Sequence, residues 1–300
     1  MTALKIGTRR SPLALAQAEE VRRSLAVHDV SVEIVPMTTS GDEGATAAAG
    51  PQGLKGLWID TILEALDNAD IDLAVHSAKD LPAEEDDGFV IAAVPQRAEP
   101  WDVLITREAG SLPQGAVIGT SALRRQAQLL AGFPGVIVQD LRGNVDTRLR
   151  KLAEGEVDAA VLAAAGLARL GLAPAHAMPL PLAVMVPAPG QGCLALQCRD
   201  DDHHTREVLS SLDHAVSHAA LDAERSVMWR LGGGCALPLG AYAEPIEGGL
   251  RLTAVIAAPD GSEILRVERS AETPEGVATL VAKDLIDGGA ERILHEARTT

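Results

Sequence analysis

Residues 4–14 read LKIGTRRSPLA, and residues 116–126 read AVIGTSALRRQ. In both stretches an apolar run ends in the tripeptide Ile-Gly-Thr and leads, through hydroxyl and arginine side chains, into a helical pattern. A strand that feeds directly into a helix is the building unit of α/β domains. Because this unit occurs once in each half of the first two thirds of the chain, we predict two α/β domains with a shared architecture.

Apolar runs and helical periods alternate outward from both stretches. In the first set we predict strands over residues 4–7, 31–36, 71–75 and 90–94, and helices over residues 13–25 and 57–67. Ser11 followed by Pro12 is a strong start signal for the first helix. Residues 38–56 have no periodicity and predict a long loop. The second set predicts strands over residues 102–106, 116–118, 136–139 and 159–162, and helices over residues 121–131, 144–154 and 163–170.

From residue 214 onward the pattern predicts a different kind of domain. A helix is expected to end at Gly232-Gly233-Gly234, because three glycines cannot continue it. Strands are predicted over residues 239–243, 250–257 and 263–269, followed by a helix over residues 274–286 and a short helix near the C-terminus. These elements make a small α+β domain.

The expected domain boundaries follow from these elements. The strand over residues 193–198 comes after a Pro/Gly-rich segment and is expected to return the chain to the first domain. We therefore predict a first domain of residues 1–96 and 192–213, a second of residues 97–191, and a third of residues 214–300.

The composition of the 300 residues excludes several classes of protein. Forty-two acidic residues against 26 basic ones give a net charge of −16, and only 2% of the chain is aromatic. An acidic surface repels the phosphate backbone of nucleic acid, and few aromatic side chains are available on which bases could stack, so nucleic acid is not expected as a partner. The N-terminal residues lack the pattern of a signal peptide, and no apolar run is long enough to span a membrane. We therefore expect a cytoplasmic protein with no membrane partner. We also expect a monomer, although none of these features bears on the oligomeric state.

Positive charge is nevertheless concentrated in one part of the chain. Residues 117–151 contain six basic residues and two acidic ones, and five of the six are arginines. Guanidinium groups bind carboxylates through two parallel hydrogen bonds. This window therefore predicts binding of an anionic small molecule.

Three junctions between a strand and a helix carry hydroxyl and arginine side chains, at residues 8–11, 120–125 and 142–148. Helix N-termini favour anions. In the helix after the third junction, apolar residues define a buried face; Arg148 flanks this face and Arg150 points away from it. We therefore predict that Arg148 binds an anion and that Arg150 is solvated.

Residues 76–82, HSAKDLP, follow an apolar strand, where α/β sheets place ligands. Lys79 offers a cation for a carboxylate, and Asp80 offers an anion for a developing positive charge. His76 has no second metal ligand at a suitable spacing, and helix capping explains the acidic run at residues 200–204. We predict no metal site.

The three cysteines differ in their surroundings, and they are too few for a disulfide framework. Cys235 follows three glycines, and such a turn leaves a thiolate open to a ligand. Cys198 shares a strand face with Leu194 and Leu196, which predicts a core position. The pattern leaves the role of Cys193 open.

Seven motifs between residues 7 and 244 together resemble the porphobilinogen deaminase family, also called hydroxymethylbilane synthases. They read GTRRSPLALAQA, DLAVHSAKDLP, IGTSALRRQAQ, LRGNVDTRLRKL, AAAGLARLGL, PGQGCLALQCR and GGGCALPLGAYAE. The resemblance implies a transferase of porphyrin and heme biosynthesis that joins four porphobilinogen molecules and releases ammonia, giving 1-hydroxymethylbilane. It also implies a dipyrromethane cofactor held through a thioether, and a fold that resembles two-lobed anion-binding proteins with a third, cofactor-bearing domain.

Matched positions give the residue roles that the resemblance implies. Cys235 would anchor the cofactor, and Asp80 would bind pyrrole N–H groups and stabilise the cation formed when ammonia leaves. Cofactor carboxylates would be held by Lys79, Ser121, Arg124 and Arg125. Substrate or the growing chain would be bound by Arg9, Ser11, Lys55, Arg142, Asn144, Thr147, Arg148, Arg169 and Gln191.

Some positions depart from the family pattern, and one other class of protein fits part of the sequence. In residues 54–63 Lys55 is retained, but Trp58 replaces phenylalanine and Asp60-Thr61 replaces Lys-Glu; Gln197 stands where the family commonly has glutamate. The alternative is a two-domain carrier that closes on an anionic metabolite without chemistry. A carrier would explain the arginines and the two similar domains, but it would leave Cys235 and Asp80 without roles.

Overall fold

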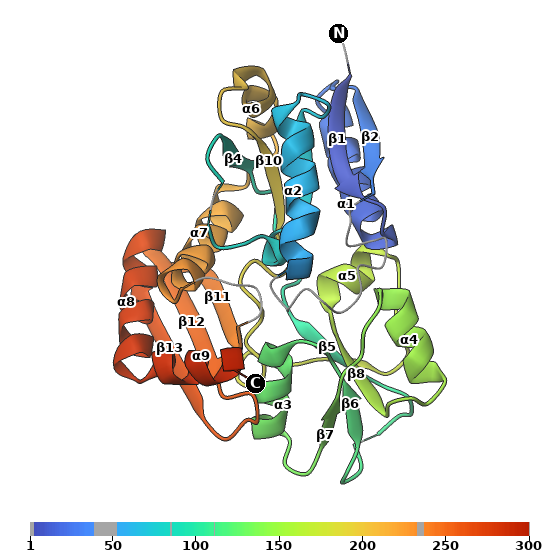
Figure 1. Cartoon of the computed structure of the whole chain (residues 1–300), viewed down its shortest axis with the longest axis vertical. Coiled ribbons are helices and arrows are strands. Elements are labelled where there is room, and N and C mark those ends of the chain that lie inside the picture. Colours follow the sequence, from blue (N-terminus) through green and yellow to red (C-terminus); the bar gives the residue numbers. More distant parts are fainter. Residues whose placement is uncertain (1–2, 39–52, 85, 111, 233–236, 300) are drawn as a thin grey trace. The chain divides into compact units, whose positions relative to one another are not determined.

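The computed structural model describes residues 3–38, 53–84, 86–110, 112–232 and 237–299 (Figure 1). The chain forms two compact units. The first comprises the described residues up to Arg97 together with Cys193–Ala219; the second comprises Ala98–Gly192, Ala220–Gly232 and the described residues from 237 onward. The division into three domains stays a prediction.

The first unit is built on a five-stranded sheet with the order β2-β1-β3-β10-β4. Its strands are β1 (Leu4–Arg9), β2 (Val32–Met37), β3 (Leu73–Ser77), β4 (Phe89–Ala93) and β10 (Leu194–Arg199). β1 runs parallel to β2 and β3, whereas β10 is antiparallel to both of its neighbours. The expected return of the chain through a strand near residues 193–198 is thus confirmed.

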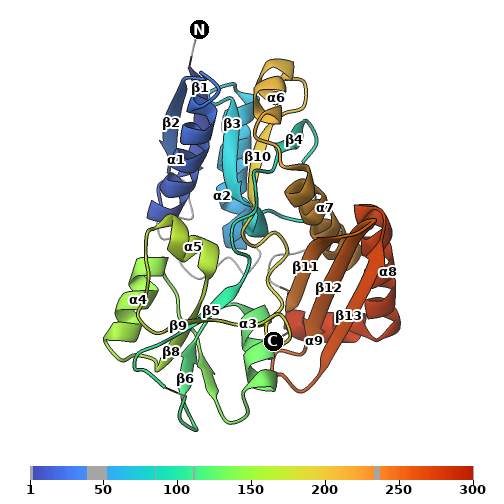
Figure 2. The same ribbon diagram turned by 180° about the vertical axis from the view of Figure 1, so that it is seen from behind.

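Helices cover both faces of this sheet. Helix α1 (Pro12–Ala26) and helix α6 (His203–Ser210) pack against the face that carries Leu73 and Val75, and helix α2 (Gly53–Asp67) packs against the face that carries Ala74. Figure 1 shows α2 in front of the sheet. In Figure 2, which views the molecule from the opposite side, α1 lies in front of the sheet. Alternate residues of β3 therefore contact opposite helical layers, which explains its continuous apolar sequence.

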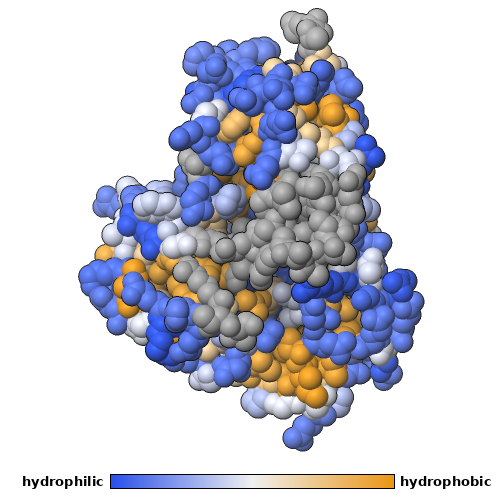
Figure 3. Space-filling view, in the orientation of Figure 1, coloured by the Kyte–Doolittle hydropathy of each residue, from blue (hydrophilic) through white to orange (hydrophobic). Residues whose placement is uncertain are grey.

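The second unit contains a sheet with the order β7-β6-β8-β5-β9. Its strands are β5 (Asp102–Thr106), β6 (Val117–Gly119), β7 (Ile137–Gln139), β8 (Ala159–Ala163) and β9 (Ala177–Pro179). Helix α3 (Leu123–Gly132) packs on one face, and helices α4 (Val145–Ala153) and α5 (Ala164–Arg169) pack on the other. Hydrophilic residues cover α4 on its outer side (Figure 3).

The two sheets share one architecture, as predicted. β6 runs parallel to β7 and β8, and β5 is antiparallel to β8 and β9, so that β6 takes the place of β1 and β5 the place of β10. The repeated Ile-Gly-Thr lies at equivalent positions of β1 and β6. A Cβ atom at Gly119 would lie 2.6 Å from Cδ2 of Leu141, and one at Gly7 would clash with Ile71. Close packing of Leu141 therefore requires glycine at position 119, whereas the atom nearest to Gly7 is the terminal methyl group of Ile71, which can move aside.

The C-terminal part contains a three-stranded antiparallel sheet, β11-β12-β13. Its strands are β11 (Leu239–Ile246), β12 (Gly249–Ala257) and β13 (Ile264–Ala271). Helix α7 (Ala215–Arg230) precedes them, and helices α8 (Pro274–Asp287) and α9 (Ala290–Thr299) follow. The predicted α+β character of this segment is confirmed.

The largest differences from the sequence prediction concern α2 and β9. Helix α2 begins at Gly53, whereas a start at residue 57 was predicted, because Gly53 and Gly56 each lower helix propensity by about 1 kcal/mol relative to alanine. Strand β9 was not predicted, since it is an exposed three-residue edge strand without an apolar pattern.

The capping prediction at residues 200–204 is confirmed: Asp202 is the N-cap of α6 and accepts a hydrogen bond from the Thr205 amide. In the described parts of the chain, every helix falls short of the length and apolar character needed to cross a bilayer.

Candidate active site

A pocket of about 90 Å³ in the first unit contains three of the predicted site residues: Arg9, Ser11 and Asp80. β1 and β3 are parallel, so their carboxyl ends meet at one edge of the sheet. The side chains that follow both strands therefore gather there. The full lining consists of Thr8, Arg9, Ser11, Leu13, Ala14, Gln17, Ile59, Ile62, Val75, His76, Ser77, Asp80 and Leu81.

The β1 side of the pocket is formed by the start of helix α1. Ser11 is the N-cap, and its hydroxyl accepts a hydrogen bond from the Ala14 amide at 3.3 Å, with Pro12 in the first turn. The buried Thr8 hydroxyl donates to the Ala14 carbonyl at 3.2 Å. The predicted start signal of this helix is thereby confirmed, and the cap fixes the backbone beside Arg9.

The β3 side of the pocket is formed by a single 3₁₀ turn, η1 (Ala78–Asp80). The Ala78 amide donates to the Cys193 carbonyl at 3.1 Å, just before β10 begins. Lys79 and Asp80 are half-buried. The carboxylate of Asp80 therefore lies on a turn that is attached to the neighbouring strand, in a pocket that also holds a guanidinium group.

Four polar residues of this pocket, Thr8, Gln17, His76 and Ser77, were not assigned to the site from the sequence. His76 is buried and lies 3.1 Å, Nε2 to Oε1, from Gln197 of β10. Gln17 donates from Nε2 to the Ser77 hydroxyl at 3.3 Å. The signal for Gln17 was available, because it is a polar residue on the same helix face as buried Ala18 and Val21.

In the second unit Arg124 and Arg125 are both buried and bind one carboxylate, that of Asp102 at the start of β5. Nη1 of Arg124 lies 2.7 Å from Oδ2, and Nε and Nη2 of Arg125 lie 2.9 and 2.7 Å from Oδ1. Burial lowers the pKa of Arg124, and the Asp102 charge opposes that shift. Asp102 was not predicted as a site residue, although an acidic residue at the start of an apolar strand is a usable signal.

Gln191 joins the same cluster. It is 1% exposed, and its Nε2 atom donates to the Pro100 carbonyl at 2.6 Å and to Oδ1 of Asp102 at 3.1 Å. Its proposed substrate contact stays a prediction, and these two bonds show that the residue also fixes the loop before β10 to the head of β5.

The start of α4 carries three predicted substrate residues, Asn144, Thr147 and Arg148. Asn144 is the exposed N-cap, and Thr147 packs against Gly143. Arg148 is half-buried and donates from Nε to the Gly143 carbonyl at 2.8 Å. By contrast Arg150 is exposed and pairs with Glu154 at 2.7 Å. The predicted difference in exposure between the two arginines is confirmed.

Nearby side chains bind the loop between β7 and α4. Arg142 is exposed and lies 2.6 Å, Nε to Oδ2, from Asp140. Burial raises the pKa of Asp140, but hydrogen bonds from Ser121 and Arg142 outweigh it, so the net shift is downward. The Ser121 hydroxyl also donates to the Leu141 carbonyl at 2.8 Å. Arg169, at the end of α5, donates to the Gly192 carbonyl at 3.2 Å.

Two predicted residues cannot be placed in this way: Cys235 and the side chain of Lys55 lie outside the described residues. The other two cysteines are buried. Burial raises the pKa of Cys198 to about 11, so its thiol is protonated at neutral pH. The predicted core position of Cys198 is confirmed.

Comparisons with known proteins agree with these motifs. Residues 4–207 match the family model "Porphobilinogen deaminase, dipyromethane cofactor binding domain", and residues 219–287 match "Porphobilinogen deaminase, C-terminal domain". A curated protein of Brevibacillus brevis named porphobilinogen deaminase is 42% identical over 298 residues, which cover 97% of this chain and 96% of that protein.

Similar solved structures are more distant. A nutrient-binding protein of Burkholderia cenocepacia bound to methionine is 16% identical, with 70% of this chain and 91% of that chain covered at a TM-score of 0.42. A periplasmic substrate-binding protein of Coxiella burnetii is 15% identical, with 74% and 96% covered at a TM-score of 0.42. The two family models and the curated relative together show that this chain is a transferase that belongs to the porphobilinogen deaminase family.

Proposed function

We propose that this chain joins four porphobilinogen molecules head to tail, with release of one ammonia per condensation, to give 1-hydroxymethylbilane. The observation that carries the proposal is the pocket in which Arg9, Ser11 and Asp80 lie together. A carrier for an anionic metabolite needs the arginine, but a carboxylate in the same pocket would repel its ligand. Membership of the porphobilinogen deaminase family independently favours catalysis over the carrier.

The charges in the pocket suit the substrate. Porphobilinogen carries an acetate, a propionate and an aminomethyl group on a pyrrole ring. The Arg9 guanidinium would bind a substrate carboxylate, and the Ser11 hydroxyl lies beside it. Further carboxylates of the substrate and the growing chain would be bound by Lys55, Arg142, Asn144, Thr147, Arg148, Arg169 and Gln191.

Asp80 would act where positive charge develops. The bond between the aminomethyl carbon and its protonated nitrogen breaks, the electron pair leaves with ammonia, and the substrate becomes a cationic azafulvene. After the new carbon–carbon bond forms, a proton leaves the ring carbon. A fixed carboxylate beside the pyrrole N–H stabilises charge in both steps, and such a group contributes about 3–4 kcal/mol, or 10²–10³ in rate.

The residues of the second unit fit the family's dipyrromethane group, which carries carboxylates. Two buried guanidinium groups bind the single carboxylate of Asp102, so the cluster has one positive charge in excess. Arg124, Arg125, Ser121, Lys79 and Asp80 would hold the group, and Cys235 would anchor it through a thioether. When bound, it supplies the terminal pyrrole carbon to which the first substrate is joined.

The remaining parts of the proposal concern partners and location. We propose a cytoplasmic monomer that binds no nucleic acid. The net charge of −16 and the small number of aromatic residues support the last point.

The experiment that tests the proposed function is a product assay. Purified protein is incubated with porphobilinogen, and ammonia and uroporphyrin (after cyclisation and oxidation of the product) are quantified. The expected result is four ammonia molecules per tetrapyrrole. Stoichiometric binding of porphobilinogen without release of ammonia would instead support the carrier.

A further inference from the structure

Asp102 is the first residue of β5, and its carboxylate binds three other residues of the second unit. Its side chain is fully buried, and its two carboxylate oxygens accept three hydrogen bonds from three residues and make one further ion-pair contact with Nη2 of Arg125. Oδ1 accepts from Arg125 and Gln191, and Oδ2 accepts from Arg124. A single carboxylate therefore orients α3 and the loop before β10 at the same time.

Backbone carbonyls hold the two arginines from the other side. Nη1 of Arg124 also donates to the Val186 carbonyl at 2.6 Å, and Nη1 of Arg125 donates to the Val161 carbonyl at 2.8 Å. Gln128 reinforces this support, because its Oε1 accepts from the Val186 amide at 2.8 Å. Each guanidinium is thus fixed between a carboxylate and a carbonyl, which removes most of its rotational freedom before any ligand binds.

The charge of the cluster depends on Asp102 as strongly as its geometry does. With Asp102 ionised, two buried guanidinium charges face one carboxylate, and one positive charge remains. Without the carboxylate, both charges would be buried uncompensated beside each other, an arrangement that is strongly unfavourable in proteins. The arginines would then separate or turn toward solvent.

From this arrangement we propose that Asp102 is a positioning residue for cofactor binding: it fixes Arg124 and Arg125 and neutralises one of their charges, so that the pair accepts one further carboxylate. The inference rests on the proposed function, because the cofactor supplies that carboxylate. Asp102 itself is fully enclosed by its partners and does not have to touch the ligand.

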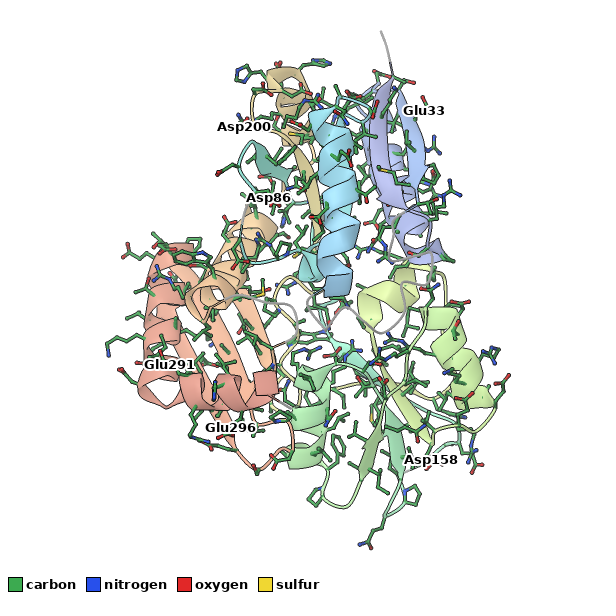
Figure 4. All side chains as sticks on the ribbon, viewed as in Figure 1. Glu33, Asp86, Asp158, Asp200, Glu291 and Glu296 are labelled. Carbon is green, nitrogen blue, oxygen red and sulfur yellow. The ribbon has the colours of Figure 1, made fainter. Side chains whose placement is uncertain are left out.

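The structure offers a matched control at the opposite end of the same strand pair. Asp102 lies opposite Ala163 in the β5–β8 pairing, and Asp158 directly precedes Ala159, which lies opposite Thr106. Asp158, labelled in Figure 4, accepts from the Val117 amide at 2.9 Å and pairs with Arg107. It is therefore a structural carboxylate of the same sheet that does not bind the arginine pair.

The test compares Asp102→Asn and Asp158→Asn with the parent protein. Each is incubated with preformed hydroxymethylbilane, and the fraction of protein that carries two linked pyrrole units is followed by intact mass, beside circular dichroism and thermal unfolding. We expect folded Asp102→Asn to acquire the cofactor roughly 10- to 100-fold more slowly. Asp158→Asn should load like the parent, even where it unfolds at a lower temperature. Equal loading rates for folded Asp102→Asn and the parent would overturn the proposal.

A second variant covers the case in which Asp102→Asn does not fold. Asp102→Glu keeps the charge but moves the carboxylate by one methylene, so we expect a folded protein whose loading is slowed and whose KM for porphobilinogen rises more than its kcat falls. Loading and KM equal to the parent's would overturn the positioning role. If the parent itself never gains the two pyrrole units and forms no product, the proposed function fails, and the inference about Asp102 fails with it.

Discussion

The backbone amide of Ala78 donates a hydrogen bond to the carbonyl of Cys193 at 3.1 Å. This bond joins the turn that carries Asp80 to the strand that returns to the first sheet after a separation of more than a hundred residues along the chain. The position of the proposed catalytic carboxylate therefore depends on the completed five-stranded sheet, and not on the HSAKDLP segment alone.

Asp80→Asn tests the role of that carboxylate. The neutral amide cannot stabilise a cation, so turnover of cofactor-loaded protein is expected to fall at least 10²-fold. Asp80→Glu keeps the charge but displaces it, so its turnover should lie between that of the parent and that of Asp80→Asn. Uroporphyrin is measured after cyclisation and oxidation, on protein whose cofactor content has been checked by mass. Turnover of loaded Asp80→Asn within a few-fold of the parent would place the catalytic group elsewhere.

Arg148 and Arg150 form a matched pair on α4. Arg148→Lys keeps the charge but loses the planar fork. We expect it to slow turnover roughly tenfold or to accumulate partly elongated enzyme, since hydrogen bonds between charged groups contribute about 1.5–3 kcal/mol. Arg150→Lys should behave like the parent, because Arg150 is exposed and pairs with Glu154. Steady-state rates and native mass spectra of both variants provide the measurement, and equal effects would refute the assignment.

The cysteines predict a difference in reactivity with pH. Burial raises the pKa of Cys198 to about 11, so its thiol stays protonated below that pH and becomes a thiolate only as the pH approaches 11. We expect an alkylating reagent at pH 8 to leave Cys198 unmodified in the folded protein. Cys198→Ser should retain the two-pyrrole adduct, and Cys235→Ser should lack it. Peptide mapping checks both points; an adduct on a peptide that contains Cys193 would move the attachment site.

The close approach of Gly119 to Leu141 predicts that an added Cβ atom lowers the free energy of unfolding. Gly119→Ala would bring a Cβ atom into Leu141, and such overpacking costs about 1–3 kcal/mol. Gly132→Ala is the control, because its Cβ would lie 3.7 Å from Val184 and the backbone there is compatible with alanine. The control should change the free energy of unfolding by less than about 1 kcal/mol. Urea unfolding of both variants decides, and a neutral Gly119→Ala would contradict the packing argument.

Strands with continuous apolar sequences were predicted well because burial on both faces leaves a strong signal. The strand over residues 102–106 was predicted with its observed bounds, and Ser11 marked the start of α1. Elements with weak signals were missed or displaced: β9 is short and exposed, and glycines obscured the first turn of α2.

The site was predictable to the extent that strand ends imply proximity. Arg9 ends β1, Ser11 follows it and Asp80 follows β3; since these strands are a parallel pair, the meeting of the three residues in one pocket follows from topology. The Asp102 cluster was not predictable in that way. Asp102 and Arg124 are 22 residues apart, and no periodicity indicates that the head of one strand lies against the first turn of α3.

The measurement that tests the account most directly is the intact mass of the purified parent protein. We predict a mass above that of the unmodified chain by two linked pyrrole units, with the surplus located on the peptide that contains Cys235. The same protein should give colour with an aldehyde reagent for pyrroles. An unmodified mass that persists after incubation with porphobilinogen and with preformed hydroxymethylbilane would contradict the proposed function.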